Sequence, residues 1–262
     1  MEVLLAVVFG LAIGAVVGTI GGGGAILALP VFVYVLGQGV SSGSTASLIV
    51  VALAASVGAG AHAAHGHLCW KVALVFALPA ALGAYLGTLA GSAVSPQALI
   101  LAFVPVMLAA AIVTYVRGGM GEGEDGEELR PCPPLEPARS SAAGLVVGAM
   151  TGFFGVGGGF LIVPALTNLL GLPLRRAIAT SLAIIGITSV SALAIHLARG
   201  AEPDWPITVV LCVAAAVGAL SGGVLGRRLS PTALAHGFGF VVAALALFLL
   251  VDVLVLGGPP GS

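Results

Sequence analysis

Residues 10–37 read GLAIGAVVGTIGGGGAILALPVFVYVLG, and residues 144–171 read GLVVGAMTGFFGVGGGFLIVPALTNLLG. The two segments lie in longer stretches, residues 3–37 and 142–171, that contain no charged residue. A straight helix over residues 3–37 would be roughly 52 Å long, whereas the hydrocarbon core of a bilayer is about 30 Å thick. Glycine clusters interrupt both stretches, so we interpret each one as two helical pieces that meet at a glycine-rich turn.

The composition excludes an ordinary soluble protein. Of 262 residues, 59% are hydrophobic and 7% are charged, whereas roughly a quarter of the residues of a soluble domain are charged. Lipid must therefore cover much of the exterior. The net charge of −1 gives no basic field for nucleic acid. The residues after Met1 and Glu2 lack the positive charges of a signal peptide, so we expect the first apolar segment to remain in the mature protein.

Six further stretches have the length and apolar character of membrane-spanning helices, which need about 20 residues. We therefore predict an all-α polytopic membrane protein. The six stretches are residues 43–61, 71–91, 97–116, 177–197, 206–226 and 232–256.

The chain contains an internal repeat. At an offset of 134 residues the glycines of the two quoted segments coincide, and His62 coincides with His196. One inserted residue raises the offset to 135, after which Trp70 coincides with Trp205. Composition bias alone does not place tryptophan and histidine in register, so we infer a duplication, which is typical of secondary transporters.

An acidic segment, residues 117–140, separates the two repeats. It contains several glutamates and prolines and cannot bury a core, so we predict a flexible aqueous linker. An acidic regulatory or metal-buffering role is the alternative. The predicted organisation is a first repeat over residues 1–116, the linker, and a second repeat over residues 141–262. Each repeat consists of a glycine-broken hairpin followed by three transmembrane helices.

Basic residues mark cytoplasmic loops and so predict the orientation. If each glycine-broken stretch is a hairpin, the repeats are inverted, and eight of the nine basic residues fall on one face. If each stretch crosses the membrane once, the repeats are parallel and the split is five to four. We therefore predict inverted repeats with both termini outside and the linker in the cytoplasm.

The two glycine turns are the candidate substrate site. Irregular backbone at membrane depth occurs where it lines a cavity or is buried in protein. Inverted symmetry brings the two tips toward the midplane, and the helices expected to begin near Ala25 and Phe160 present unpaired amides and positive dipole ends there. This arrangement predicts an anion site. We assign the glycines within the helices to close packing. The predicted tip residues are Gly21, Gly22, Gly23, Gly24, Ala25, Gly155, Gly157, Gly158 and Gly159.

Polar residues near the start of the following helices are further candidates. The hydroxyls of Thr45, Ser47, Thr180 and Ser181 can donate to an oxyanion, or they can cap the helix or bond back to a carbonyl. Both interpretations stay open. Asn168 lies in an apolar segment, where an unpaired amide is costly, so we predict a substrate-binding or interhelical role.

His62 and His196 occupy the same repeat position, and inversion places them near opposite faces. Because histidine titrates near neutral pH, the pair can gate access or exchange a proton; the alternative is a helix-end histidine at the interface.

His62, His65, His67 and Cys69 lie close together in sequence. This spacing suggests a metal site, and the alternative is that the histidines are placed at a helix end. The three cysteines have no paired spacing, so we expect no disulfide framework.

GAVVGTIGGGGAILALPVFVYVLG and GAMTGFFGVGGGFLIVPALTNLLGL, followed by STASL and ATSL, are similar to the two signatures of the TauE/SafE sulfite-exporter family. The resemblance covers the chain outside the linker. It implies a permease of the prokaryotic cytoplasmic (inner) membrane for sulfite, sulfoacetate or other organosulfur anions. The first copy departs from the second, with Ala25 in place of Gly159 and Thr45-Ala46-Ser47 in place of Ala179-Thr180-Ser181, a difference that bears on the substrate.

The sequence contains no nucleophile elbow, HExxH or P-loop motif, so we expect no enzyme, no cofactor and no metal centre. Transport by alternating access would then draw on an ion or substrate gradient. The expected partners are a small anion and the lipid bilayer, without nucleic acid, and a homodimer is left open. Two alternatives remain: a divalent-metal permease and a non-transporting membrane assembly factor.

Overall fold

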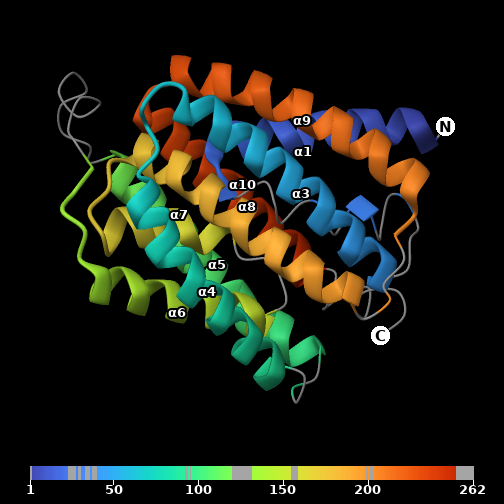
Figure 1. The fold of residues 1–262 in the computed structure, drawn as a ribbon, viewed down its shortest axis with the longest axis horizontal. Coiled ribbons are helices and arrows are strands. Elements are labelled where there is room, and N and C mark those ends of the chain that lie inside the picture. The colour runs from blue at the N-terminus through green and yellow to red at the C-terminus, as the bar shows by residue number, and fades with distance from the viewer. Residues whose placement is uncertain are drawn as a thin grey trace.

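The computed structural model describes residues 2–22, 28, 31–32, 36, 40–91, 94, 96–119, 132–154, 159–198, 200 and 203–251. These residues form helices joined by short turns, without a strand among them (Figure 1). Within this part of the chain, five helices are long and apolar enough to cross a membrane. The predicted all-α polytopic membrane fold is therefore confirmed.

A helix occupies each of the six predicted stretches, with residues 252–256 of the last one outside the described residues. Four of these helices are among the five that are long enough to cross a membrane, whereas the apolar helices at residues 101–116 and 232–248 are shorter. Helix also occupies residues 117–119 and 137–140, at the two ends of the predicted linker. The first repeat contains α1 (Glu2–Ile20), α3 (Val40–Ala63), α4 (Trp70–Gly91) and α5 (Pro96–Gly119), and the second contains α6 (Pro137–Phe154), α7 (Gly159–Asn168), α8 (Leu174–Ala198), α9 (Trp205–Arg228) and α10 (Pro231–Val251).

Proline and glycine set many of the helix ends. α5, α6 and α10 begin at a proline, a residue that fits the first turn because its missing N–H has no acceptor there. Gly66, Gly171 and Gly200 follow α3, α7 and α8 at positive φ, the conformation that commonly ends a helix. The local signals for the boundaries are therefore present in the sequence.

The glycine clusters break the long stretches as predicted. α6 ends at Phe154 and α7 begins at Gly159, so the second stretch contains two helices. α1 ends at Ile20, and the next residue, Gly21, has φ +80°, which L-residues rarely adopt. Most of the chain between Gly22 and α3 lies outside the described residues.

Two helix pairs pack one repeat against the other. α1 lies along α9, and α4 lies along α6 (Figure 1). The repeat offset matches α1 to α6 and α4 to α9. The first helix of each repeat, α1 or α6, therefore packs on the equivalent helix of the other repeat, α9 or α4. A methyl group at Gly14 or Gly148 would overlap the backbone of Ala215 or Ala80. The helical glycines therefore have the packing role predicted for them.

The other matched helices pack against each other, α3 on α8 and α5 on α10. Thr45 contacts His196, whereas Gly58, later in α3, lies beside Leu182, earlier in α8. Tyr115 stacks on His236, with ring centroids 4.2 Å apart, and Ala111 lies beside Gly239. Because one residue number rises as the other falls, both pairs of equivalent helices run antiparallel.

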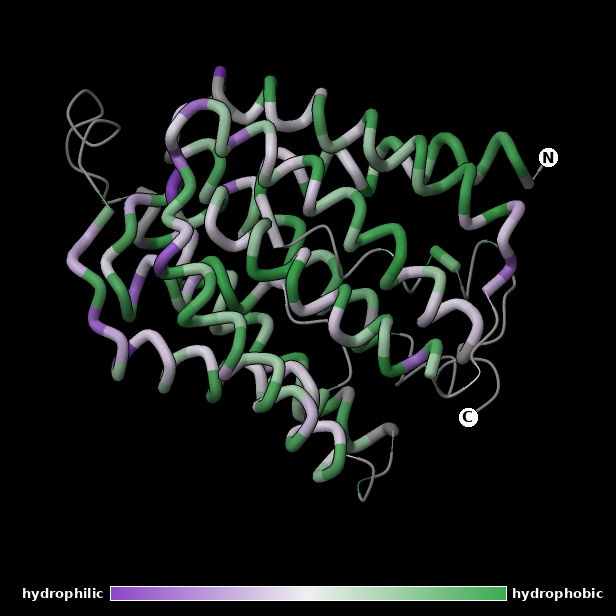
Figure 2. Tube along the Cα trace, viewed as in Figure 1, coloured by the Kyte–Doolittle hydropathy of each residue, from purple (hydrophilic) through white to green (hydrophobic). Residues whose placement is uncertain are grey.

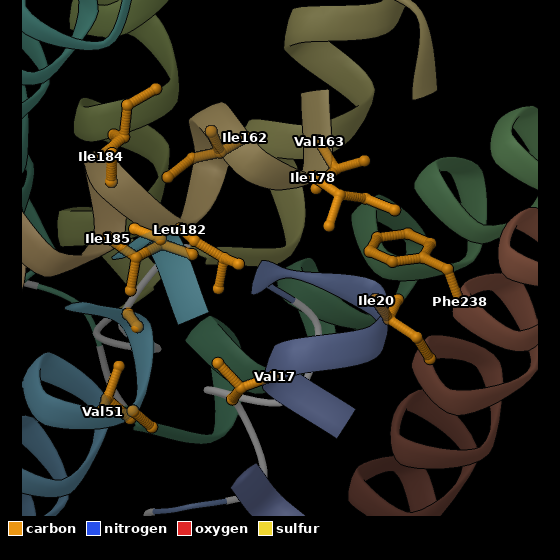
Figure 3. Packing of buried hydrophobic residues seen from close by; sticks show 14 of the residues in the cluster. Val17, Ile20, Val51, Ile162, Val163, Ile178, Leu182, Ile184, Ile185 and Phe238 are labelled. Atoms are coloured by element: carbon orange, nitrogen blue, oxygen red, sulfur yellow. The ribbon is translucent and has the colours of Figure 1, made fainter. Parts of the chain in front are cut away.

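The core lies between these pairs. Buried apolar residues from α1, α3, α7, α8 and α10 form one cluster, and Figure 3 shows Val17, Ile20, Val163, Ile178 and Phe238 within it. The outer helix faces are also apolar, since side chains such as Leu78 on α4 are 71% exposed. Hydrophilic residues lie mainly near the helix ends (Figure 2). An apolar exterior is what lipid contact requires.

One expectation was wrong. Cys69 and Cys132 form a disulfide, with Cα atoms 5.8 Å apart. The two residues are 63 positions apart in sequence, so their spacing contained no signal. The tertiary structure brings the α3–α4 loop against the segment before α6. Cys212, on α9, is free and buried.

Candidate functional site

The two glycine turns meet inside the protein. Gly22, just after α1, lies against Gly159, the first residue of α7, and both are buried. A methyl group at Gly159 would lie 2.8 Å from the Gly22 Cα, and one at Gly22 would overlap the Gly159 carbonyl. Only glycine permits this backbone contact. The structure therefore brings together Gly21, Gly22 and Gly159 of the predicted tips.

Gly21 faces α8. A methyl group there would lie 2.8 Å from the Ser181 Oγ and 3.4 Å from the Ile178 carbonyl oxygen. Ser181 is fully buried, and its hydroxyl donates to the Ile178 carbonyl at 2.8 Å. This is a bond back into its own helix, one of the two predicted interpretations. Rotation about χ1 would redirect the hydroxyl.

The N-terminus of α7 provides the electrostatic character of the site. The first amides of a helix have no acceptor within it, and they carry the positive end of the helix dipole. Because α7 begins at Gly159, this end lies beside Gly22. The position favours an anion. Asn168 is the last residue of α7, roughly 14 Å further along the helix, so the structure does not bring it to the turn.

The other predicted hydroxyls form bonds within and between elements. Thr45 Oγ1 lies 3.1 Å from His196 Nδ1, which joins the start of α3 to the end of α8. Thr180 Oγ1 accepts from the Cys69 backbone N–H at 3.3 Å. Ser47 donates to the Ser44 carbonyl at 2.8 Å. Thr45 and Thr180 are fully buried, so these two bonds connect α3 to α8 and the α3–α4 loop to α8 inside the protein.

The matched histidines lie at opposite ends of α3. His196 contacts Thr45 near its start, and His62 lies in its last turn, roughly 25 Å of helix away. The His62 Nε2 is 3.4 Å from the Gly18 carbonyl oxygen. The two histidines therefore have different surroundings, although they share one repeat position.

A pocket that sequence analysis missed lies beside Gly21. Its empty volume is about 260 Å³, including open solvent. In the sequence, Arg175 is one of the eight basic residues on the predicted cytoplasmic face, and the Arg175-Arg176 pair just before a predicted spanning helix was a signal for this pocket. The lining residues are Thr19, His62, His67, Arg175, Ile178, Gly226 and Leu234.

The histidines and the cysteine that suggested a metal site in the sequence make other contacts. Cys69 is in the disulfide, and His65 Nδ1 lies 2.8 Å from the Ala61 carbonyl oxygen. Over the described ranges, no three His, Cys, Asp or Glu side chains gather as metal ligands would. The remaining predicted tip residues, Gly23, Gly24, Ala25, Gly155, Gly157 and Gly158, lie outside the described residues.

The chain is similar to known membrane transporter proteins over most of its length. A family model described as "Sulfite exporter TauE/SafE" matches residues 6–249. A probable membrane transporter protein of Xylella fastidiosa is 34% identical over 247 residues, which cover 91% of each chain. Probable membrane transporter proteins of Methanocaldococcus jannaschii and Bacillus subtilis are 24% and 23% identical, covering 94% and 91% of this chain and 95% and 96% of their own. No solved structure gives a significant match.

Proposed function

The chain belongs to the sulfite exporter TauE/SafE family, and from that premise we propose that it is a secondary permease for a small sulfur oxyanion. The substrate we propose is sulfite or an organosulfonate such as sulfoacetate. The family and the apolar helices make the chain a multi-pass membrane transporter. The substrate and the mechanism below are our proposal.

The backbone contact between Gly22 and Gly159 carries the proposal. An anion beside this contact would meet the first amides of α7 at close range, because neither Gly22 nor Gly159 has a side chain. Amide donors and a helix dipole attract an oxyanion without a full positive charge. Such binding suits a permease, since a transported ion must also leave its site.

Alternating access follows if the repeats are inverted. The antiparallel packing of α3 on α8 and of α5 on α10 supports inversion, because an axis in the membrane plane turns each helix of one repeat over in the other. Rocking of the two repeats about the glycine turns would then expose one site to each face in turn. An ion or substrate gradient would drive the cycle.

We also propose that the basic end of the molecule faces the cytoplasm of a prokaryotic inner membrane. Arg175 donates to the Leu229 carbonyl, and Arg176 lies 3.5 Å from the Cys132 sulfur. These contacts gather the start of α8, the α9–α10 turn and the end of the linker at one end. Arg139 and Arg228 adjoin these segments in sequence, and Lys71 follows Cys69, which a disulfide joins to Cys132. The positive-inside rule supports this orientation.

The Cys69–Cys132 disulfide lies at the same end. It favours the opposite orientation, with this end outside, because disulfides are rare in the cytosol. We give more weight to the charges. Eight basic residues agree on this orientation, whereas one cysteine pair can be oxidised or reduced without a change of topology.

We further propose that His62 and His196 take part in gating or in proton exchange. Their positions at opposite ends of α3 support this role, because each would lie near a different face. Each access route would then contain one imidazole, a side chain that proteins use for proton exchange.

Flux into proteoliposomes tests the proposed function. Purified protein is reconstituted, and uptake of sulfite, sulfoacetate and sulfate is compared with that of protein-free vesicles. We expect flux of sulfite or sulfoacetate that depends on the protein. Absence of flux for every anion in the panel would contradict the proposal. The divalent-metal alternative has lost support, since Cys69 of its proposed cluster is in a disulfide.

A further inference from the structure

The pocket beside Gly21 has a basic lining. Arg175, His62 and His67 line it together with Thr19, and its remaining lining residues are apolar or glycine. These residues come from α1, α3, the α3–α4 loop, α8, α9 and α10. Segments distant in sequence therefore bring three basic side chains to one cavity, whose surface is otherwise mainly apolar.

The Arg175 guanidinium is held in place. One terminal nitrogen donates to the Leu229 carbonyl at 2.9 Å, and the residue is half-buried. This bond to a neutral carbonyl orients the guanidinium. Arginine presents five N–H donors in a planar fork that matches the oxygens of an oxyanion.

The two histidines extend the basic lining from the surface inward. His67 is half-buried, and His62 is buried with its Nε2 3.4 Å from the Gly18 carbonyl oxygen. Their ring centroids are 6.4 Å apart. Because Gly18 belongs to the last turn of α1, the inner end of the pocket reaches the helix that leads into the glycine turn.

Ile178 connects the pocket to the glycine turn. It lines the pocket, and its side chain and carbonyl oxygen both lie 3.4 Å from the place that a Gly21 side chain would occupy. Thr19, two residues before Gly21, lines the pocket as well. Ile178 is thus next to both the pocket and Gly21.

The other end of the α3–α8 pair differs in sequence. At the repeat offset, Arg175 corresponds to Ser41, and Thr19 corresponds to Phe153. His62 corresponds to His196, whose ring contacts Thr45. The duplication therefore did not preserve this basic lining in both repeats.

We infer that the pocket is a second anion site, a vestibule that binds a small oxyanion through Arg175, His62 and His67. As a capture site for the transported substrate it rests on the proposed function. The oxyanion binds first at the basic end and then passes Ile178 to the glycine turns. The fixed charge of Arg175 raises the local anion concentration at this end.

Binding of inorganic sulfate to the purified full chain in detergent tests the site without requiring transport. Sulfate is chosen because sulfite attacks disulfides. We expect Arg175→Gln and His67→Gln to weaken sulfate binding by about tenfold, the effect of removing one charged hydrogen-bond donor. His65→Gln is the matched control, because His65 is exposed and contacts Ala61 instead. Arg175→Lys, which keeps the charge, should lose less than Arg175→Gln.

The outcomes separate the two proposals. Unchanged sulfate binding in both pocket variants, or no binding by the wild type, would overturn the vestibule. Sensitive binding in a protein that moves neither sulfite nor sulfoacetate would support the site and contradict the proposed substrates. If Arg175→Gln fails to fold, as judged by size-exclusion chromatography, His67→Gln decides, because His67 lies in a loop.

Discussion

The two ends of the α3–α8 pair contain the same histidine in unlike surroundings. At one end His62 lines a pocket with His67 and Arg175. At the other end His196 contacts the buried hydroxyl of Thr45. The duplication placed a histidine at both ends, and the neighbouring residues made one end cationic. The repeat therefore determines the position of each histidine, whereas the residues around it, which differ between the repeats, determine its contacts.

The glycine turns lie between these two ends. Gly22 comes from the first repeat and Gly159 from the second, and neither position tolerates a side chain. If the proposed function is right, both ends lead to this contact. Changes at the centre should then have larger effects than changes at either end.

The first prediction asks which end faces the cytoplasm. In a cysteine-free background, Glu136→Cys marks the linker end, where its side chain is 60% exposed, and Asp204→Cys marks the opposite loop. We expect an impermeant maleimide on intact cells to label Asp204→Cys nearly completely and to miss Glu136→Cys, because basic segments remain inside. Permeabilised cells provide the control. Labelling of Glu136→Cys alone would reverse the orientation of both ends.

The second prediction concerns the shared centre. Gly159→Ala forces a methyl group against the Gly22 backbone. We expect sulfite flux to fall about five- to a hundredfold, since overpacking of this kind costs about 1–3 kcal/mol. Gly60→Ala is the matched control, because a methyl group at Gly60 would meet no neighbouring atom within 4 Å. Folded yield is measured alongside flux. Wild-type flux in Gly159→Ala would remove the turn from the transport site.

The third prediction concerns the disulfide at the basic end. Reducing the Cys69–Cys132 bond frees a loop of 63 residues, and we expect the purified protein to lose about 2–4 kcal/mol of stability. Thermal unfolding with and without reductant measures the change. Cys132→Ser should reproduce the loss and become insensitive to reductant. Cys212→Ala, at a free cysteine, should keep the response; equal melting temperatures for Cys132→Ser and wild type would contradict a stabilising role.

The fourth prediction concerns the other end. Thr45→Val removes the hydroxyl that lies 3.1 Å from His196 Nδ1, and we expect a loss of about 1 kcal/mol of stability, the usual net value of a buried hydrogen bond. Combining Thr45→Val with His196→Ala gives a double-mutant cycle. Additive losses in that cycle would show that the two side chains are not coupled.

The smallest expected effect is on the pH profile of flux. His62→Gln and His196→Gln remove an imidazole from each end, and with the proposed role in proton exchange we expect each to flatten the dependence of flux on pH. His236→Gln, on α10 beside Tyr115, is the control. Profiles of both variants that overlay the wild-type curve would limit these histidines to structural contacts.

Much of the fold was predictable because membrane helices have strong local signals. Long apolar stretches predicted the helices from α3 to α10, and Gly155 to Gly159 predicted the break between α6 and α7. The candidate site was predictable only in outline. Residues Gly21, Gly22 and Gly159 were identified, but Asn168 lies at the far end of α7. An α-helix of this length places its last residue far from its first, so the apolar surroundings of Asn168 in sequence were no sign of a place in the turn.

The sequence by itself determined that this chain is a duplicated helical membrane protein. Lipid contact requires apolar residues along every spanning helix, and duplication repeats residues at a fixed offset, so both features can be recognised in the sequence. Tertiary structure alone decided which segments meet. It paired Cys69 with Cys132, placed Gly22 on Gly159, and gathered Arg175, His62 and His67 around one pocket. Such contacts join residues far apart in sequence, and their geometry follows from how the helices pack, which no local pattern specifies.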